Sequence, residues 1–142
     1  MRSIMFVKES HLVDELVTQL TSSGNPFAAV RIASEFGYLN GRADVVAVTS
    51  DQLLITFEAK LIKWKKALDQ AYRNSAFSHY SYVVLPTSMR SIAMKRRHEF
   101  ERRGVGLCSI GIDHFEIDIQ ARKKNPLQPW LTESAFDHVE CR

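Results

Sequence analysis

Apolar residues recur at helical spacing near the start of the chain. The members of this pattern are Leu12, Val13, Leu16, Val17 and Leu20. A repeat of about 3.6 residues predicts an amphipathic helix, here over residues 9–22. Gly24, followed by Asn25 and Pro26, supplies residue types that end a helix, so we expect this element to stop there.

The next three segments have the composition of β-strands. They cover residues 27–36, 44–49 and 53–59 and are rich in valine, leucine, isoleucine and phenylalanine. Asn40 and Gly41 form a dipeptide typical of a hairpin turn between the first two segments. Ser50 and Asp51 separate the second segment from the third. The pattern predicts three antiparallel strands in a meander.

The remaining elements alternate between helix and strand. Patterning predicts a helix over residues 61–77, a strand over 80–85, a basic helix over 88–103, and strands over 105–110 and 115–119 around a turn at 111–114. Residues 121–142 are expected to form a tail with a short helix, packed on or extending from a domain of residues 1–120. A meander followed by a crossover helix predicts an α/β fold with a mixed sheet and helices on both faces.

Three charged residues interrupt the apolar pattern of the second and third strands. They are Asp44, Glu58 and Lys60, and a charge buried there is costly unless it is paired or binds a metal. Because side chains alternate along a strand, Glu58 and Lys60 share one face. If the turn centres near Asp51, Asp44 lies opposite Glu58 with Cβ atoms about 4.5–5.5 Å apart. Two carboxylates that close repel each other unless a cation lies between them.

This pair has the oxygen chemistry that Mg²⁺ binds. Mg²⁺ prefers oxygen ligands and retains several waters, so Asp44, Glu58 and the backbone carbonyl of Ala59 would form a partial shell. Lys60 would orient an attacking water or stabilise charge developing on a phosphate. The structural alternative is an internal ion pair between Glu58 and Lys60, with Asp44 exposed at an edge, since an isolated Glu-x-Lys is common.

The residues of this hairpin resemble a known nuclease superfamily. Residues 41–48 (GRADVVAV) and 57–60 (FEAK) are similar to the PD-(D/E)XK nucleases, which include restriction enzymes and archaeal Holliday junction resolvases. The resemblance covers about residues 8–86, and the departure from the motif is Ala43 in place of proline. It implies a restriction-endonuclease-like fold and Mg²⁺- or Mn²⁺-dependent hydrolysis of nucleic acid, with DNA preferred to RNA.

A closer likeness is to small bacterial phosphodiesterases of this superfamily. It rests on residues 8–12 (KESHL), on Gln70 and on residues 82–86 (YVVLP). The likeness implies that Glu9 and Gln70 border the metal site. Helical spacing places Glu9 on the apolar face of its helix, so we expect it to point inward, although a glutamate in a first turn also stabilises the helix N-terminus. Glu35 is expected to be an edge residue.

Basic residues gather along the predicted helices. The apolar side of the predicted helix 61–77 consists of Leu61, Trp64, Leu68, Ala71 and Tyr72, and the basic residues lie on the opposite side. The residues that we expect to contact a phosphate backbone are Arg42, Lys63, Lys66, Arg73, Lys95 and Arg96. Such contacts position a nucleic acid without reading its sequence. A solvated helix face has the same pattern, and this alternative stays open.

Composition narrows the class of protein. The 142 residues are 45% apolar and 25% charged, with a net charge of +3, which fits one globular domain. Cys108 and Cys141 lack zinc-site or disulfide spacing and are expected to be free thiols. No run of about 18 apolar residues is present, and residues 1–12 turn charged too early for a signal peptide. We therefore expect a cytoplasmic protein with no membrane partner.

Other catalytic chemistries are not indicated. The five histidines show no zinc or nucleophile spacing, and the chain has no Gly-rich phosphate loop and no serine elbow. Hydrolysis would depend on the metal site, and one site per chain would require a homodimer to cut both strands, or a partner subunit for specificity. Two alternatives stay open: a nuclease-like domain that binds nucleic acid or regulates without turnover, and a structural protein whose hairpin charges form an ion pair.

Overall fold

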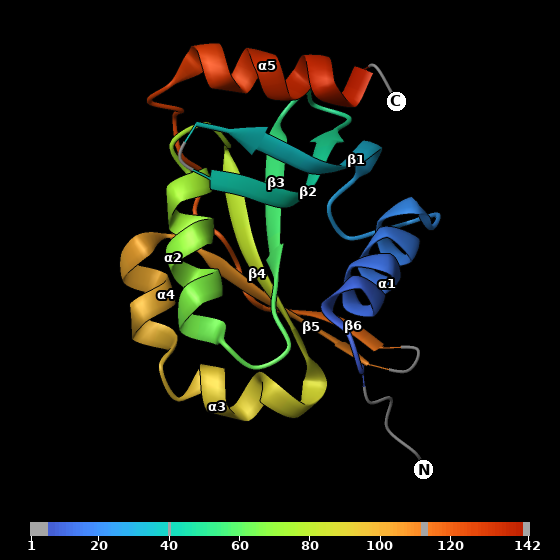
Figure 1. The fold of residues 1–142 in the computed structure, drawn as a ribbon, viewed down its shortest axis with the longest axis vertical. Helices are drawn as coiled ribbons and strands as arrows, with labels where there is room; N and C mark the ends of the chain where they lie inside the picture. Colours follow the sequence, from blue (N-terminus) through green and yellow to red (C-terminus); the bar gives the residue numbers. More distant parts are fainter. Residues whose placement is uncertain (1–5, 40, 112–113, 141–142) are drawn as a thin grey trace.

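A six-stranded mixed sheet forms the centre of the structure, a computed structural model that describes residues 6–39, 41–111 and 114–140 (Figure 1). The strands lie in chain order: β1 (Ala29–Tyr38), β2 (Gly41–Thr49), β3 (Leu54–Ala59), β4 (Tyr80–Pro86), β5 (Gly106–Gly111) and β6 (His114–Ile119). The pairs β1–β2, β2–β3 and β5–β6 are antiparallel, whereas β3–β4 and β4–β5 are parallel. The predicted α/β class with a mixed sheet is confirmed.

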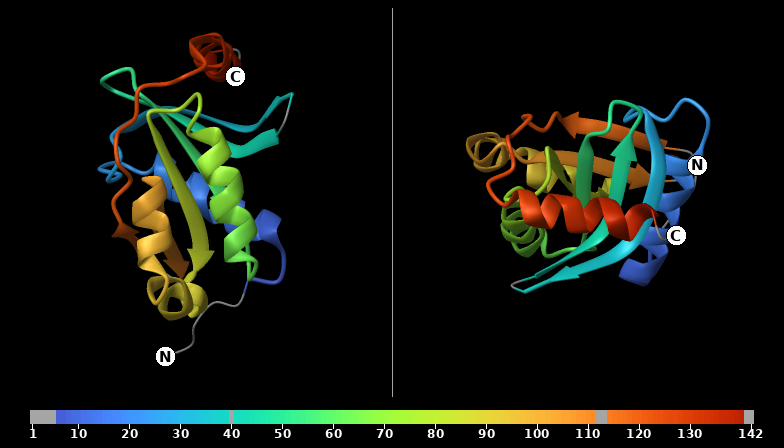
Figure 2. Two further views of the ribbon diagram at one scale, coloured as in Figure 1. Left: turned by 90° about the vertical axis from the view of Figure 1, so that its left-hand side faces the viewer. Right: turned by 90° about the horizontal axis from the view of Figure 1, so that it is seen from above.

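Helices cover both faces of this sheet (Figures 1 and 2). They are α1 (Glu9–Thr21), α2 (Trp64–Asn74), the 3-10 turn η1 (Thr87–Met89), α3 (Arg90–Met94), α4 (Arg97–Arg103) and α5 (Pro129–Glu140). One face packs against α1, and the other packs against α2 and α4. Helix α5 lies across the end of the sheet formed by β1 and β2. Within the described ranges, no helix combines the length and the apolar character needed to cross a membrane.

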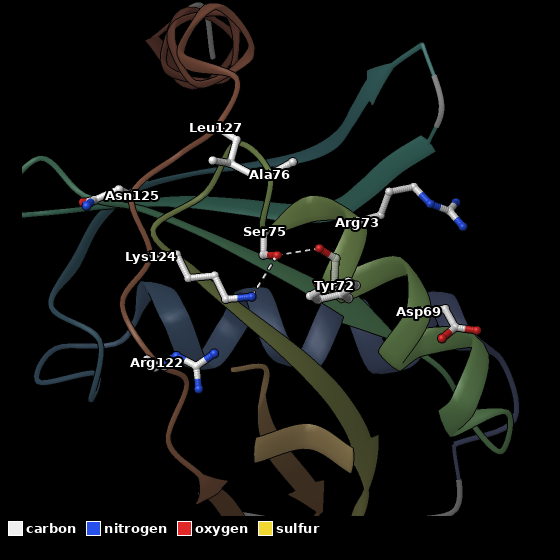
Figure 3. Close-up of a pocket in the computed structure, with 9 residues that line it drawn as sticks. All are labelled: Asp69, Tyr72, Arg73, Ser75, Ala76, Arg122, Lys124, Asn125 and Leu127. Atoms are coloured by element: carbon white, nitrogen blue, oxygen red, sulfur yellow. Dashed lines mark hydrogen bonds between the residues drawn. The ribbon is translucent and has the colours of Figure 1, made fainter. Parts of the chain in front are cut away.

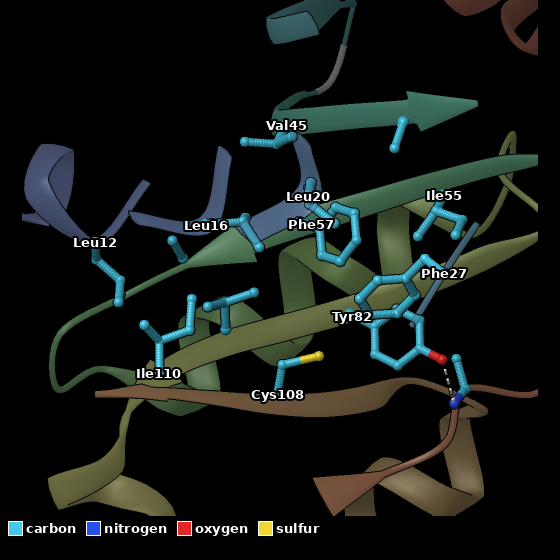
Figure 4. Close-up of a cluster of buried hydrophobic side chains, with 14 residues drawn as sticks. Leu12, Leu16, Leu20, Phe27, Val45, Ile55, Phe57, Tyr82, Cys108 and Ile110 are labelled. Carbon is cyan, nitrogen blue, oxygen red and sulfur yellow. Dashed lines mark hydrogen bonds between the residues drawn. The ribbon is translucent and has the colours of Figure 1, made fainter. Parts of the chain in front are cut away.

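The core beneath α1 follows the alternation of side chains along the strands. Leu12, Leu16 and Leu20 are the fully buried residues of α1, as their spacing predicts. They pack on Val45 of β2 and Phe57 of β3, within one cluster that continues across the sheet (Figure 4). Val45 and Ala47 of β2 therefore face α1, as do Ile55, Phe57 and Ala59 of β3.

The even positions of the same strands face the opposite side. Val46 and Val48 of β2 pack in a separate cluster with Leu54 of β3. Glu58 has the same parity as Leu54 and faces α2, where Asn74 donates to it. Asp44 lies between α2 and α1, since it lines cavities with residues of both helices. The candidate site therefore lies where α1 and α2 both approach the β2–β3 hairpin.

Two helices differ from the patterns expected for them. The helix predicted over residues 61–77 spans only Trp64–Asn74, because residues 61–63 form the connection from β3. Tyr72, predicted on its apolar side, is half exposed. The helix predicted over 88–103 is divided into η1, α3 and α4, since the backbone of Arg96 (φ −117°, ψ 27°) leaves the helical region.

The segment after β6 returns along the sheet to α5. The backbone N–H of Lys124 donates to the carbonyl of His79 at 2.9 Å, and the hydroxyl of Thr132 donates to the carbonyl of Phe77 at 2.6 Å. These contacts join residues more than forty positions apart in the chain. Residues 121–140 are therefore packed on the rest of the chain.

Three expectations fall on residues that are not described. The turn residue Asn40, the turn residues 112–113 and Cys141 lie outside the described ranges. Cys108, which is described, is a buried free thiol on β5. Burial raises the pKa of this thiol well above its ordinary value, so Cys108 is a packing residue and not a nucleophile.

Candidate functional site

The β2–β3 hairpin brings Asp44 and Glu58 together. Val45 pairs with Phe57, and one further step of this antiparallel register places Asp44 opposite Glu58. The backbone N–H of Asp44 donates to Oε2 of Glu58 at 3.2 Å, and the backbone N–H of Ala59 donates to Oδ2 of Asp44 at 2.9 Å. The register predicted from a turn near Asp51 is therefore the register of the structure.

Glu58 is a buried carboxyl group beside a second one. Only 5% of the surface of Glu58 is exposed to solvent. Burial, and next the charge of Asp44, raise the pKa of Glu58 to about 8, while the hydrogen bond from Asn74 acts in the opposite direction. The pair therefore holds a second negative charge less readily than two separate carboxyl groups would. A divalent cation between the two groups would supply the missing positive charge.

Hydrogen-bonded polar side chains of α2 and β1 connect to Glu58. Asn74 is fully buried and donates from its side-chain amide to Oε2 of Glu58 at 3.0 Å. Its carbonyl oxygen accepts from the hydroxyl of Tyr38 at 2.6 Å and from the amide of Gln70 at 3.0 Å. Gln70 also donates to the hydroxyl of Tyr38 at 3.0 Å. Gln70 therefore reaches the carboxyl pair through Asn74.

Asn74 and Tyr38 were not among the predicted site residues. A signal for Asn74 was present, because position 74 follows Ala67 and Ala71 at helical spacing on the buried face of α2. A buried amide on an apolar face requires a hydrogen-bonding partner. Tyr38 gave no comparable signal, since its contact depends on how closely β1 approaches α2.

Lys60 and Glu9 meet at the edge of the site. Nζ of Lys60 lies 3.5 Å from Oε1 of Glu9, and these side chains are 32% and 47% exposed. The ion pair of Lys60 in the described part of the chain is thus with Glu9 and not with Glu58. The expectation that Glu9 points into the interior is wrong. Glu9 is the first residue of α1 and precedes Leu12, the first buried residue of the helix. Its side chain therefore lies outside the core.

One cavity of about 490 Å³ joins these groups. Its lining includes Glu9, Arg42, Asp44, Glu58, Lys60, Lys66, Gln70 and Arg73. Three of the six predicted phosphate contacts, Arg42, Lys66 and Arg73, therefore border the carboxyl pair. The other three, Lys63, Lys95 and Arg96, are not among the described lining residues. Lys63 precedes α2, Lys95 and Arg96 lie between α3 and α4, and Arg96 pairs with Glu99 at 2.7 Å.

Glu35 and Asp44 line a smaller cavity of about 310 Å³. The guanidinium of Arg42 lies 3.6 Å from Asp44 and 3.8 Å from Glu35. Glu35 has a φ of 55°, which is the left-handed region that residues other than glycine rarely adopt. Strand β1 is the first strand of the sheet, so the expectation of an edge residue is confirmed.

The carboxyl pair offers few protein oxygens to a metal ion. Within the described ranges, no group of three or more His, Cys, Asp or Glu residues is arranged to hold a metal ion. The side-chain ligands available here are the two carboxyl groups, whose hydrogen bonds occupy Oδ2 of Asp44 and Oε2 of Glu58. The remaining oxygens suit Mg²⁺ or Mn²⁺, which leave other positions to water or substrate.

Comparisons with known proteins identify a fold but no family. No protein-family model and no curated protein matches the chain. A protein of unknown function from Silicibacter pomeroyi has a similar structure, with a TM-score of 0.68 and 12% identity over 96% of this chain and 87% of that one. A repair endonuclease from Pyrococcus abyssi matches with a TM-score of 0.44 and 15% identity, over 75% of this chain and 49% of that one.

Proposed function

We propose that this chain is a metal-dependent nuclease that hydrolyses phosphodiester bonds of nucleic acid, with DNA preferred to RNA. The observation that carries the proposal is the opposed pair Asp44 and Glu58 in a cavity that also contains lysine and arginine side chains. A polyanion is the partner that satisfies such a cavity. The resemblance of residues 41–48 and 57–60 to the PD-(D/E)XK superfamily supports the same function.

In this proposal Asp44, Glu58 and the carbonyl of Ala59 hold Mg²⁺ or Mn²⁺. The bound ion would act as a Lewis acid on the phosphate and lower the pKa of a bound water. The two carboxyl groups lie side by side because the register of β2 and β3 imposes it. Asn74 fixes the orientation of Glu58, so one oxygen of each carboxyl remains outside the hydrogen bonds described above.

Lys60 is the proposed group that positions the attacking water and stabilises the phosphate. It lines the same cavity as the carboxyl pair and carries a positive charge at its edge. Glu9 holds the amine of Lys60 at 3.5 Å and so determines where this charge lies. Arg42, Lys66 and Arg73 would bind the neighbouring phosphates of the substrate.

A substrate panel tests the proposal. Purified protein is incubated with single-stranded, duplex and branched DNA and with RNA, in Mg²⁺, in Mn²⁺ and in EDTA. We expect cleavage that requires the metal and is lost in Asp44→Ala and Lys60→Ala. Lys65→Ala is a matched control, because Lys65 is an exposed lysine of α2 outside the cavity lining. Cleavage that persists in both site variants would refute the proposal.

The competing function is binding of nucleic acid without turnover. One observation favours it: the amine of Lys60 contacts Glu9 and forms no ion pair with Glu58 in the described part of the chain. Binding of the panel in every metal, with no cleavage, would establish this function instead. If duplex cleavage is found, one site per chain implies that two copies act on the two strands, which sedimentation with and without DNA tests.

A further inference from the structure

A second cavity of about 780 Å³ lies beside α2 (Figure 3). Its lining includes Asp69, Tyr72, Arg73, Arg122, Lys124 and Leu127. Asp69 and Arg73 also line the cavity that contains Asp44 and Glu58. These two residues are one helical turn apart on α2, so the two cavities are adjacent along this helix. Chain segments from α2 and from the region after β6 form the walls.

The cavity contains an exposed aromatic ring. Tyr72 is 51% exposed, and the neighbouring Leu127 is 82% exposed. Nζ of Lys124 lies 4.8 Å from the centroid of the Tyr72 ring, and Cζ of Arg103 lies 5.9 Å from it. Figure 3 shows Lys124 directed toward Tyr72 from the opposite wall. An aromatic ring flanked by cations is the arrangement on which single-stranded nucleic acids stack their bases.

Two cations of this cavity, Lys124 and Arg122, are held by neutral oxygens. Lys124 donates to the hydroxyl of Ser75 at 3.2 Å and to the carbonyl of Arg103 at 2.5 Å. Arg122 donates to the carbonyl of Glu101 at 3.2 Å. Within the described ranges, neither cation has a carboxylate within 4 Å. Burial and the charge of Arg122 lower the pKa of Lys124. The cavity therefore has excess positive charge that an anion would neutralise.

We propose that this cavity binds an unpaired nucleotide of the nucleic acid, with its base against Tyr72 and its phosphate near Arg122. The choice of a nucleic acid rests on the function proposed above. A base within a duplex is stacked on both faces and paired along its edge, so it cannot enter a cavity of this kind. The shared residues Asp69 and Arg73 let one strand pass from the Asp44–Glu58 cavity into this one. The substrate therefore contains a single-stranded segment, such as an overhang, flap or extruded base.

Binding in EDTA tests this proposal without cleavage. Fluorescence anisotropy measures the Kd of wild-type protein for a labelled oligothymidylate and for a blunt duplex of equal length. We expect Tyr72→Ala to weaken binding of the single strand about 5- to 100-fold, since stacking of one base contributes at this level. Tyr72→Phe keeps the ring and should bind as wild type. Trp130→Ala removes another exposed aromatic residue, on α5, and should change nothing.

A salt titration separates the ring from the phosphate contact. Arg122→Gln removes a charge and keeps an amide donor, so the slope of log Kd against log salt should fall by about 0.7 for the single strand. Tyr72→Ala should leave this slope unchanged. Because Arg122 is exposed, this variant also gives a result if Tyr72→Ala fails to fold.

The outcomes distinguish this proposal from the nuclease function. The nucleotide site is overturned if wild-type protein binds no single strand, or if Tyr72→Ala leaves the affinity for the single strand unchanged. It is also overturned if Tyr72→Ala weakens binding of single strand and duplex equally, or if Arg122→Gln leaves the salt slope unchanged. A selective loss in Tyr72→Ala supports the nucleotide site even if no substrate is cleaved, in which case the nuclease function alone fails. Cleavage of duplex and single strand at equal rates, unaffected by Tyr72→Ala, would leave the nuclease and remove the nucleotide site.

Discussion

The side-chain amide of Asn74 donates a 3.0 Å hydrogen bond to Oε2 of Glu58, the oxygen that also accepts the backbone N–H of Asp44. Asn74 is fully buried, and its carbonyl oxygen accepts from Tyr38 and from Gln70. One buried amide therefore links α2 and β1 to the carboxyl pair of the hairpin. The orientation of Glu58 depends on this side chain.

Replacement of Asn74 by alanine should destabilise the protein. Asn74→Ala leaves the carboxyl of Glu58 and the hydroxyl of Tyr38 without this partner inside the fold. We expect the free energy of unfolding, measured by urea denaturation, to fall by about 1–3 kcal/mol. Asn125→Ala is the matched control at an exposed asparagine and should change it by less than about 0.5 kcal/mol. Equal effects of the two substitutions would show that the buried hydrogen bonds contribute no stability.

The stability of the metal-free protein should depend on the ionisation of Glu58. Its pKa is raised from 4.5 to about 8, so the folded state binds this proton more tightly than the unfolded state. The resulting stabilisation is fully present below about pH 4.5 and is lost as the pH rises through about 8. In EDTA, wild-type protein should lose on the order of a few kcal/mol relative to Glu58→Gln across this range.

Urea denaturation at a series of pH values measures this difference. Glu133→Gln, at an exposed glutamate of α5, is the control and should keep the wild-type pH dependence. If the curves of wild type and Glu58→Gln run parallel from acid to alkaline pH, the carboxyl of Glu58 does not titrate in the way described.

The register of the hairpin followed from the sequence alone. A short turn near Asp51 and the alternation of apolar residues leave one antiparallel pairing, and that pairing sets Asp44 opposite Glu58. The buried face of α1 followed in the same way from the spacing of Leu12 and Leu16. Local periodicity determines such features, because each depends on residues close together in the chain.

The support around the site could not be predicted in this way. Tyr38, Gln70 and Asn74 meet because α2 packs against the sheet at one particular rotation and distance. The ion pair of Lys60 with Glu9 joins residues about fifty positions apart, after α1 has packed on the sheet. Periodicity gives the buried face of an element but not its position relative to elements far away in the chain.

A divalent cation should stabilise the protein through the carboxyl pair. At a concentration of 100 times its Kd, Mg²⁺ or Mn²⁺ is expected to add about 2.7 kcal/mol to the free energy of unfolding. Asp44→Asn should abolish this gain. Above about pH 8, where Glu58 is ionised, it should also raise the stability of the metal-free protein, because it removes the repulsion with Glu58. Thermal denaturation with and without the metal measures both effects. An equal rise in Tm for wild type and Asp44→Asn would place the cation elsewhere.

The backbone at Glu35 carries conformational strain. Its φ of 55° costs a residue with a Cβ about 1–2 kcal/mol, whereas glycine adopts this region freely. We therefore expect Glu35→Gly to be about 1 kcal/mol more stable than Glu35→Ala in urea denaturation. The same pair of substitutions at Asp14, within α1, should give the opposite order by a similar amount. The same order at both positions would contradict a strained backbone at Glu35.

The ion pair of Glu9 and Lys60 should affect activity more than stability. Both side chains are partly exposed, so their interaction at 3.5 Å is expected to contribute about 0–1 kcal/mol to folding. Under the proposed function, Lys60→Gln should lower kcat about 100-fold or more, because it would remove a charge that acts on the reacting phosphate. Glu9→Gln should lower kcat by about tenfold with an unchanged KM, since it only loosens the position of the amine. If each variant instead loses stability by several kcal/mol and activity in proportion, the pair holds the fold together and Lys60 has no part in the reaction.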